Sequence, residues 1–160
     1  MKLIDATKII AASAICMVTI PAFSQSFKAD GPVQAQGAWV RATVAGQKST
    51  GAFMRITASS ATRLVGVSSP VAGLAEVHEM KMIGNVMTMR EAPAIDLPAG
   101  KAVDFKSGGY HIMLMDLKQP LPPGSTVALT LKFSDALGVK RTLQLVVPVS
   151  KLAPAAAAGH

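Results

Sequence analysis

Short apolar segments of period two, separated by turn residues, constrain the fold of this chain more than any other feature. Alternation of apolar and polar residues puts every second side chain on one face of a strand. Turn residues interrupt the alternation at intervals of roughly 8–12 residues, which is typical of β-sandwiches and barrels. The nine segments that we interpret as strands are 33–40, 51–56, 64–67, 75–82, 86–90, 103–105, 111–117, 127–133 and 143–147.

Helical structure is not indicated by the same patterns. No segment shows a convincing 3.6-residue apolar period, and only 71–76 leaves room for one helical turn. The length of 160 residues fits one domain, and an apolar share of 50% excludes a disordered chain. We therefore predict a single all-β domain over residues 25–150, a sandwich of about seven to nine strands, followed by a disordered tail at 151–160.

The first 24 residues have the pattern of a cleaved secretory signal peptide. Lys2 and Lys8 lie in a short charged start, and a nearly unbroken apolar run covers 9–20. Small residues then precede an expected cleavage site after Ser24. The run is shorter than the ~20 residues that cross a bilayer, so we expect no membrane insertion after cleavage, with a retained signal anchor as the alternative. The mature chain is expected to begin near Gln25, in the periplasm.

The only cysteine, Cys16, lies inside the apolar run. Ile15 precedes it, whereas a lipoprotein cysteine needs a small residue at that position, so we expect signal cleavage to remove Cys16. A mature chain without thiols suits an oxidising compartment. It also excludes a disulfide framework, a multi-cysteine zinc or iron–sulfur site, and a blue-copper centre, which needs a cysteine ligand.

The charge of the chain is positive, +7 in full and +6 after removal of residues 1–24. A basic protein can bind nucleic acid, but export and an aromatic content of 4% argue against that class. The simpler interpretation is a solvated basic surface. A weak field that steers the protein toward an acidic partner is the functional alternative.

Methionine and histidine gather in one part of the chain. Residues 78–115 hold six of the seven methionines of the mature chain and two of its three histidines. Methionine clusters usually fill cores, and a lone histidine on a strand is seldom a ligand. The spacing favours a ligand role here, because His111 and Met113 are two residues apart on a strand and project from the same face. His78 and Met80 have the same relation.

The segments on either side of residues 84–85 form a predicted hairpin. Gly84-Asn85, with glycine first, fits a two-residue type II′ turn. That turn fixes the register, and His78 then lies diagonal to Met89 at about 7–8 Å. The expected cross-strand pairs are Ile83 with Val86, Met82 with Met87, and Met80 with Met89. A second strand with His111 and Met113 would complete one site.

Two imidazoles and two thioethers form a soft, neutral ligand set. Thioether sulfur favours Cu(I), whereas zinc prefers thiolate, imidazole or carboxylate, and calcium prefers oxygen. Such a set suits transfer of the ion more than storage. A metal-free interaction module of the periplasm is the main alternative, because β-sandwiches often serve binding. A metalloenzyme is less favoured, since catalytic sites keep an open coordination position, and we find no nucleophile motif.

The intervals between these four residues are specific. Ten residues separate His78 from Met89, twenty-one separate Met89 from His111, and one separates His111 from Met113. This spacing resembles the signature of the periplasmic copper chaperones called PCu(A)C, and the resemblance covers about residues 36–149. The flanking sequences that share it are AWVRAT at 38–43, LVGVSSP at 64–70, EVHEM at 76–80 and GGYHIMLM at 108–115.

The resemblance implies a fold, a ligand set and partners. The fold is a cupredoxin-like, Greek-key β-sandwich, and one Cu(I) is held without catalysis by His78, Met89, His111 and Met113. The implied acceptors are the copper-site subunit of cytochrome c oxidase and Sco-type proteins, with no nucleic acid. Some members carry a histidine- and methionine-rich tail that binds Cu(II), but this tail offers only His160.

The remaining residues of interest have structural interpretations beside functional ones. The methionines outside the ligand set either form an outer thioether shell or pack in the core or at its rim, the commoner role. They are Met80, Met82, Met87 and Met115. Trp39 is expected in the core or at a sheet edge, and Tyr110 is expected to pack on the face opposite the histidines. Arg41, Arg55 and Arg90 are expected to be solvated.

Overall fold

The computed structural model describes residues 32–154 and contains ten strands. The predicted signal peptide and the tail from residue 155 onward lie outside the described residues. Within residues 32–154 there is no helix long and apolar enough to cross a bilayer. The strands are β1 (Val33–Arg41), β2 (Ser49–Ala58), β3 (Thr62–Ser68), β4 (Ala72–Ile83), β5 (Val86–Glu91), β6 (Ile95–Leu97), β7 (Ala102–Phe105), β8 (Tyr110–Leu117), β9 (Thr126–Asp135) and β10 (Lys140–Ser150).

The all-β prediction is confirmed, and each of the nine predicted segments lies inside an observed strand. Two details were wrong. The chain has one strand more than the predicted maximum, because β6 has only three residues and is too short to show alternation. The helical turn allowed at 71–76 does not form, since β4 already begins at Ala72.

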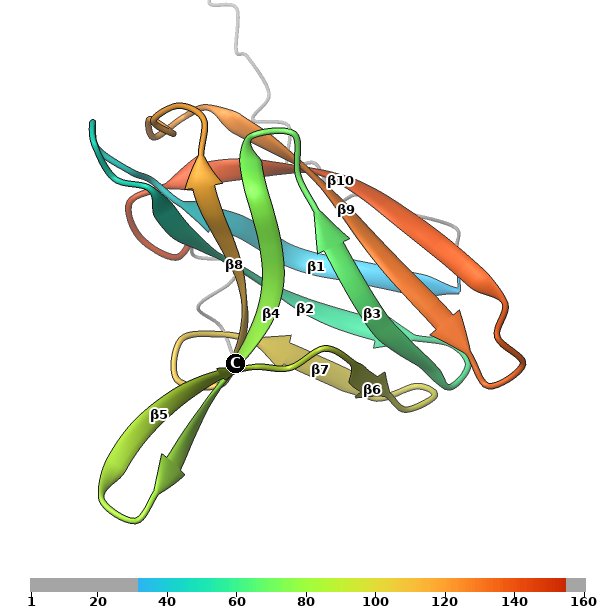
Figure 1. The fold of residues 1–160 in the computed structure, drawn as a ribbon. Helices are drawn as coiled ribbons and strands as arrows, with labels where there is room; N and C mark the ends of the chain where they lie inside the picture. Colours follow the sequence, from blue (N-terminus) through green and yellow to red (C-terminus); the bar gives the residue numbers. More distant parts are fainter. Residues whose placement is uncertain (1–31, 155–160) are drawn as a thin grey trace, which may run out of the picture.

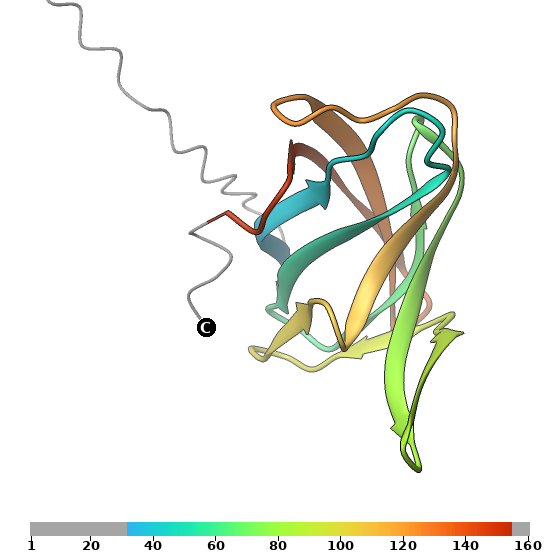
Figure 2. The ribbon, with the colours of Figure 1, turned by 90° about the vertical axis from the view of Figure 1, so that its left-hand side faces the viewer.

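All ten strands belong to one hydrogen-bonded sheet in the order β5-β4-β8-β7-β2-β1-β10-β9-β3-β6. The sheet folds into two facing layers, β5-β4-β8-β7-β2-β1 and β10-β9-β3-β6 (Figures 1 and 2). A short parallel pairing of β1 with β10, Val40 opposite Val149, joins the layers. The core lies between them, and its largest fully buried side chains are Phe105, Phe133, Ile56, Leu64, Leu97, Ile112, Leu114, Leu129 and Leu131.

The alternation along β8 decides which residues are available for chemistry. Ile112 and Leu114 have no exposed surface and face the core. His111 and Met113 therefore lie on the outer face of the layer, because successive side chains point to opposite faces. On the neighbouring strand β4, buried Val77 faces the core and puts His78 on the outer face as well.

The β4–β5 hairpin extends beyond the two layers (Figure 1). Its register agrees with the prediction, pairing Ile83 with Val86 and continuing through both methionine pairs. Gly84 has a φ of +61°. Asn85 does not share that positive φ, which matches a type II′ turn. The Gly84-Asn85 turn was therefore sufficient to predict this part of the register.

Candidate metal centre

The two histidines lie directly opposite one another on adjacent strands. His78 of β4 pairs with His111 of β8, and their ring centroids are 6.1 Å apart in an edge-to-face arrangement. Directly opposite residues of an antiparallel pair share one face of the sheet. The sequence predicts that a second strand with His111 and Met113 completes the site, but it does not predict that the two imidazoles lie directly opposite one another.

Each ring nitrogen of His78 has a distinct environment. Nε2 lies 3.1 Å from Oε2 of Glu76, and because a carboxylate only accepts, the ring nitrogen donates. In the neutral ring the lone pair is then on Nδ1. That atom is buried and has no hydrogen-bond partner among the described residues. Buried polar atoms rarely stay unpaired, so Nδ1 of His78 is available to bind a metal ion.

His111 is held by a different contact. Its Nδ1 donates to the carbonyl oxygen of Gly109 at 3.2 Å, so its lone pair is on Nε2 in the neutral form. The residue is only 7% exposed although it lies on the outer face. Second partners of this kind orient imidazole ligands in metal sites. Both histidines are thus oriented by a backbone or carboxylate acceptor.

The thioethers surround the histidines unequally. Met80, His111 and Met113 line one open cavity of about 290 Å³. Met89 is half exposed at 50% and lies opposite Met80, diagonal to His78, as the predicted register required. The structure therefore brings His78, His111 and Met113 to neighbouring positions, with Met89 one strand further out and Met80 between them.

Glu76 is the residue near the site that sequence reasoning missed. It lies opposite Met113 and shares the outer face with His78, two residues further along β4. The spacing of two was visible in the sequence and is the signal that would have identified it.

The donor set limits which metal this arrangement can hold. Among residues 32–154 there is no group of three or more His, Cys, Asp or Glu side chains able to hold a metal ion. The donors beside the two imidazoles include the sulfur atoms of Met80, Met89 and Met113. Sulfur and imidazole without thiolate or multiple carboxylates match Cu(I) better than zinc, magnesium or calcium.

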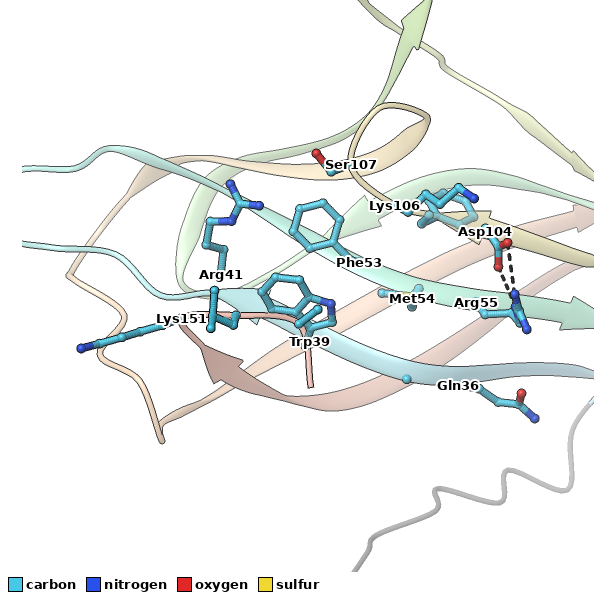
Figure 3. Close-up of a pocket in the computed structure, with 14 residues that line it drawn as sticks. Gln36, Trp39, Arg41, Phe53, Met54, Arg55, Asp104, Lys106, Ser107 and Lys151 are labelled. Atoms are coloured by element: carbon cyan, nitrogen blue, oxygen red, sulfur yellow. Dashed lines mark hydrogen bonds and ion pairs between the residues drawn. The ribbon is translucent and has the colours of Figure 1, made fainter. Parts of the chain in front are cut away.

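A second, larger cavity of about 530 Å³ lies beside this one on the outer face. Trp39 and Phe53 stack along it with ring centroids 4.8 Å apart, and the Arg41 guanidinium lies 5.5 Å from the Phe53 ring (Figure 3). Trp39 is buried, but it lies outside the main core. Arg55 is not simply solvated, since its Nε donates to Asp104 at 2.6 Å and this contact raises the pKa of Arg55.

The predictions for the other residues had mixed outcomes. Met82 and Met87 are 58% and 46% exposed, so neither lies in the core, which was one of the two packing positions expected for them. Tyr110 packs on the core side with its ring 6.1 Å from that of Phe105, as predicted. Burial, and then the charge of Glu79, raise the pKa of Tyr110.

The chain is similar to a described protein family over most of its length. The family described as "Putative lipoprotein LpqE-like" matches residues 33–149. The chain is 37% identical over 137 residues to "Putative lipoprotein Lxx21020" of Leifsonia xyli subsp. xyli, covering 84% of this chain and 80% of that protein.

Two solved structures are similar over most of the chain. The solution structure of CuI-DR1885 from Deinococcus radiodurans is 33% identical with a TM-score of 0.61, covering 82% of this chain and 87% of that one. The copper-bound PCuAC domain from PmoF2 is 25% identical with a TM-score of 0.62, covering 78% and 97%. The resemblance expected from the spacing of histidines and methionines is confirmed. This chain belongs to the LpqE-like family, the PCuAC type of cupredoxin-like β domain.

Proposed function

We propose that this protein is a periplasmic copper chaperone that holds one Cu(I) through His78, Met89, His111 and Met113. The observation that carries the proposal is the facing pair of imidazoles, with the buried Nδ1 of His78 lacking a hydrogen-bond partner among the described residues. Relatives whose names record bound copper, CuI-DR1885 and the PmoF2 domain, support the same cargo.

The environment of the ligands suits delivery of the ion. His111 and Met113 lie on β8, which is flanked by hydrogen-bonded strands, whereas Met89 lies on the exposed strand β5. A neutral set with one exposed thioether leaves an approach from solvent. Met89 is therefore the ligand that an acceptor displaces first, and the two histidines and Met113 hold the ion until transfer.

The destination and the compartment are part of the proposal. Following the PCu(A)C resemblance, the acceptors are the copper-site subunit of cytochrome c oxidase and Sco-type proteins, and no reaction is catalysed. The lipoprotein names of the family and of the Leifsonia relative support an exported protein. The signal peptide predicted at residues 1–24 supports the periplasm.

Competition titration of Cu(I) against a chromogenic chelator under reducing conditions tests the site. Single alanine substitutions of the four ligands should each weaken binding by more than the roughly 10–100-fold that loss of an outer-shell partner costs. The control is Ile83→Ala, an exposed residue of the same hairpin. An unchanged Cu(I) affinity in all four variants would show that the ligand assignment is wrong. An absence of Cu(I) binding by the wild-type protein would favour a metal-free interaction module.

A further inference from the structure

The two faces of the β4–β5 hairpin differ in chemistry. One face holds the Glu79–Arg90 ion pair, 3.0 Å long, and the pair of Lys81 with Thr88. The other face continues the outer face of the metal centre outward. It consists of Met80 opposite Met89 and, one step nearer the turn, Met82 opposite Met87.

The outer methionine pair lies outside the buried core. Met82 is 58% exposed and Met87 is 46% exposed, although both are large apolar side chains. Single exposed apolar residues are common on protein surfaces and need no explanation. Two thioethers directly opposite one another, in line with a predicted Cu(I) centre, form a more specific arrangement.

The spacing of the pair suits a shared ion. Side chains directly opposite in an antiparallel pair have Cβ atoms about 4.5–5.5 Å apart, and methionine has three flexible bonds. Both sulfur atoms can therefore converge on one ion above the sheet. Met80 lies two residues from Met82 on the same face and also lines the cavity of His111 and Met113.

We propose that Met82 and Met87, with Met80 as the shared inner thioether, form a second and more weakly held Cu(I) site. This site lacks imidazole and is open to solvent, so the ion exchanges there faster than at the histidines. Cu(I) binds first to the hairpin, passes along Met80 to the metal centre, and leaves by the same path. The entry role rests on the proposed function, whereas the second binding site itself does not.

The test uses the full chain labelled with [methyl-¹³C]methionine and titrated with Cu(I) under reducing conditions. The double variant Met82→Ala/Met87→Ala is compared with Ile83→Ala/Val86→Ala. The control pair is directly opposite on the same hairpin, 57% and 65% exposed, on the other face and without sulfur. We expect the wild type and the control to bind a second equivalent that shifts the Met82 and Met87 methyl resonances. The methionine double variant should lose that equivalent and keep the first.

A His111→Ala/Met113→Ala background separates this proposal from the chaperone proposal. Shifts of the Met82 and Met87 methyl groups that persist there support the second site even if the histidine centre fails. Methyl resonances that stay unmoved by two equivalents of Cu(I) overturn it. Shifts that follow protein concentration instead of copper also overturn it, because the apolar pair would then contact a second copy of the chain. An unchanged rate of Cu(I) transfer to a chelator in Met82→Ala/Met87→Ala would overturn the entry role.

Discussion

Removal of the Glu76 carboxylate should weaken Cu(I) binding although Glu76 is not a ligand. Its Oε2 accepts from Nε2 of His78 at 3.1 Å, and the two side chains are only 26% and 13% exposed. The contact keeps the proton on Nε2 and leaves the lone pair of His78 on the buried Nδ1. Without Glu76 the ring can rotate or exchange its tautomer.

The size of the effect follows from the role of such partners. Loss of an outer-shell acceptor typically reduces metal affinity about 10–100-fold, which corresponds to about 1.4–2.7 kcal/mol. Both side chains are mostly shielded from water, so we expect Glu76→Ala to lie within that range. Glu76→Gln should recover part of the loss, because its amide oxygen still accepts a hydrogen bond.

The assay combines Cu(I) competition titration with ¹⁵N NMR of the histidine rings. Glu79→Ala is the matched control, since Glu79 is the neighbour of His78 on the same strand but pairs with Arg90 on the opposite face. Thermal unfolding of each metal-free variant checks that the fold is retained. An affinity of Glu76→Ala within about two-fold of the wild type would refute the positioning role. A spectrum in which Nε2 of His78 binds the copper ion would also refute the positioning role.

Three further predictions test the core, the tyrosine and the export signal. Ile112→Ala, at a position with no exposed surface between the two proposed β8 ligands His111 and Met113, should lower the free energy of unfolding by about 2–5 kcal/mol in a denaturant titration. Tyr110 is the only tyrosine, so tyrosinate absorbance reports on it alone, and its midpoint should lie above the ordinary value of 10.0 in the metal-free protein and return to it in denaturant. Because the pKa of Tyr110 is raised in the folded state, the stability linked to its protonation is complete below about pH 10 and is lost as the pH rises through the folded pKa. A midpoint at or below 10.0 in the folded protein would contradict the raised pKa. Mass spectrometry of the periplasmic fraction should find a chain that begins at or near Gln25, and a full-length membrane-bound product would be evidence for a retained anchor.

Local patterns in the sequence were sufficient for the strands and for the hairpin. Period-two alternation identified nine of the ten strands, and the Gly84-Asn85 turn determined the pairing of Met80 with Met89. Both follow from contacts between residues that are close in sequence, where turn geometry and the pleat leave few alternatives. The sequence pattern did not predict β6, because its three residues form a strand through their pairing with β3 and not through an alternation of their own.

Only the tertiary structure decided which strands pair and what surrounds each proposed ligand. Alternation showed from which face of its strand each of His78 and His111 projects. That the two histidines lie opposite one another depends on the pairing of β4 with β8, which belongs to the sheet order. That order is set by burial of one shared core, which involves residues from all parts of the domain. The same long-range packing leaves Nδ1 of His78 without a partner among the described residues and exposes Met82. A period of two specifies the face of a strand, whereas neighbours and burial arise from the packing of the whole chain.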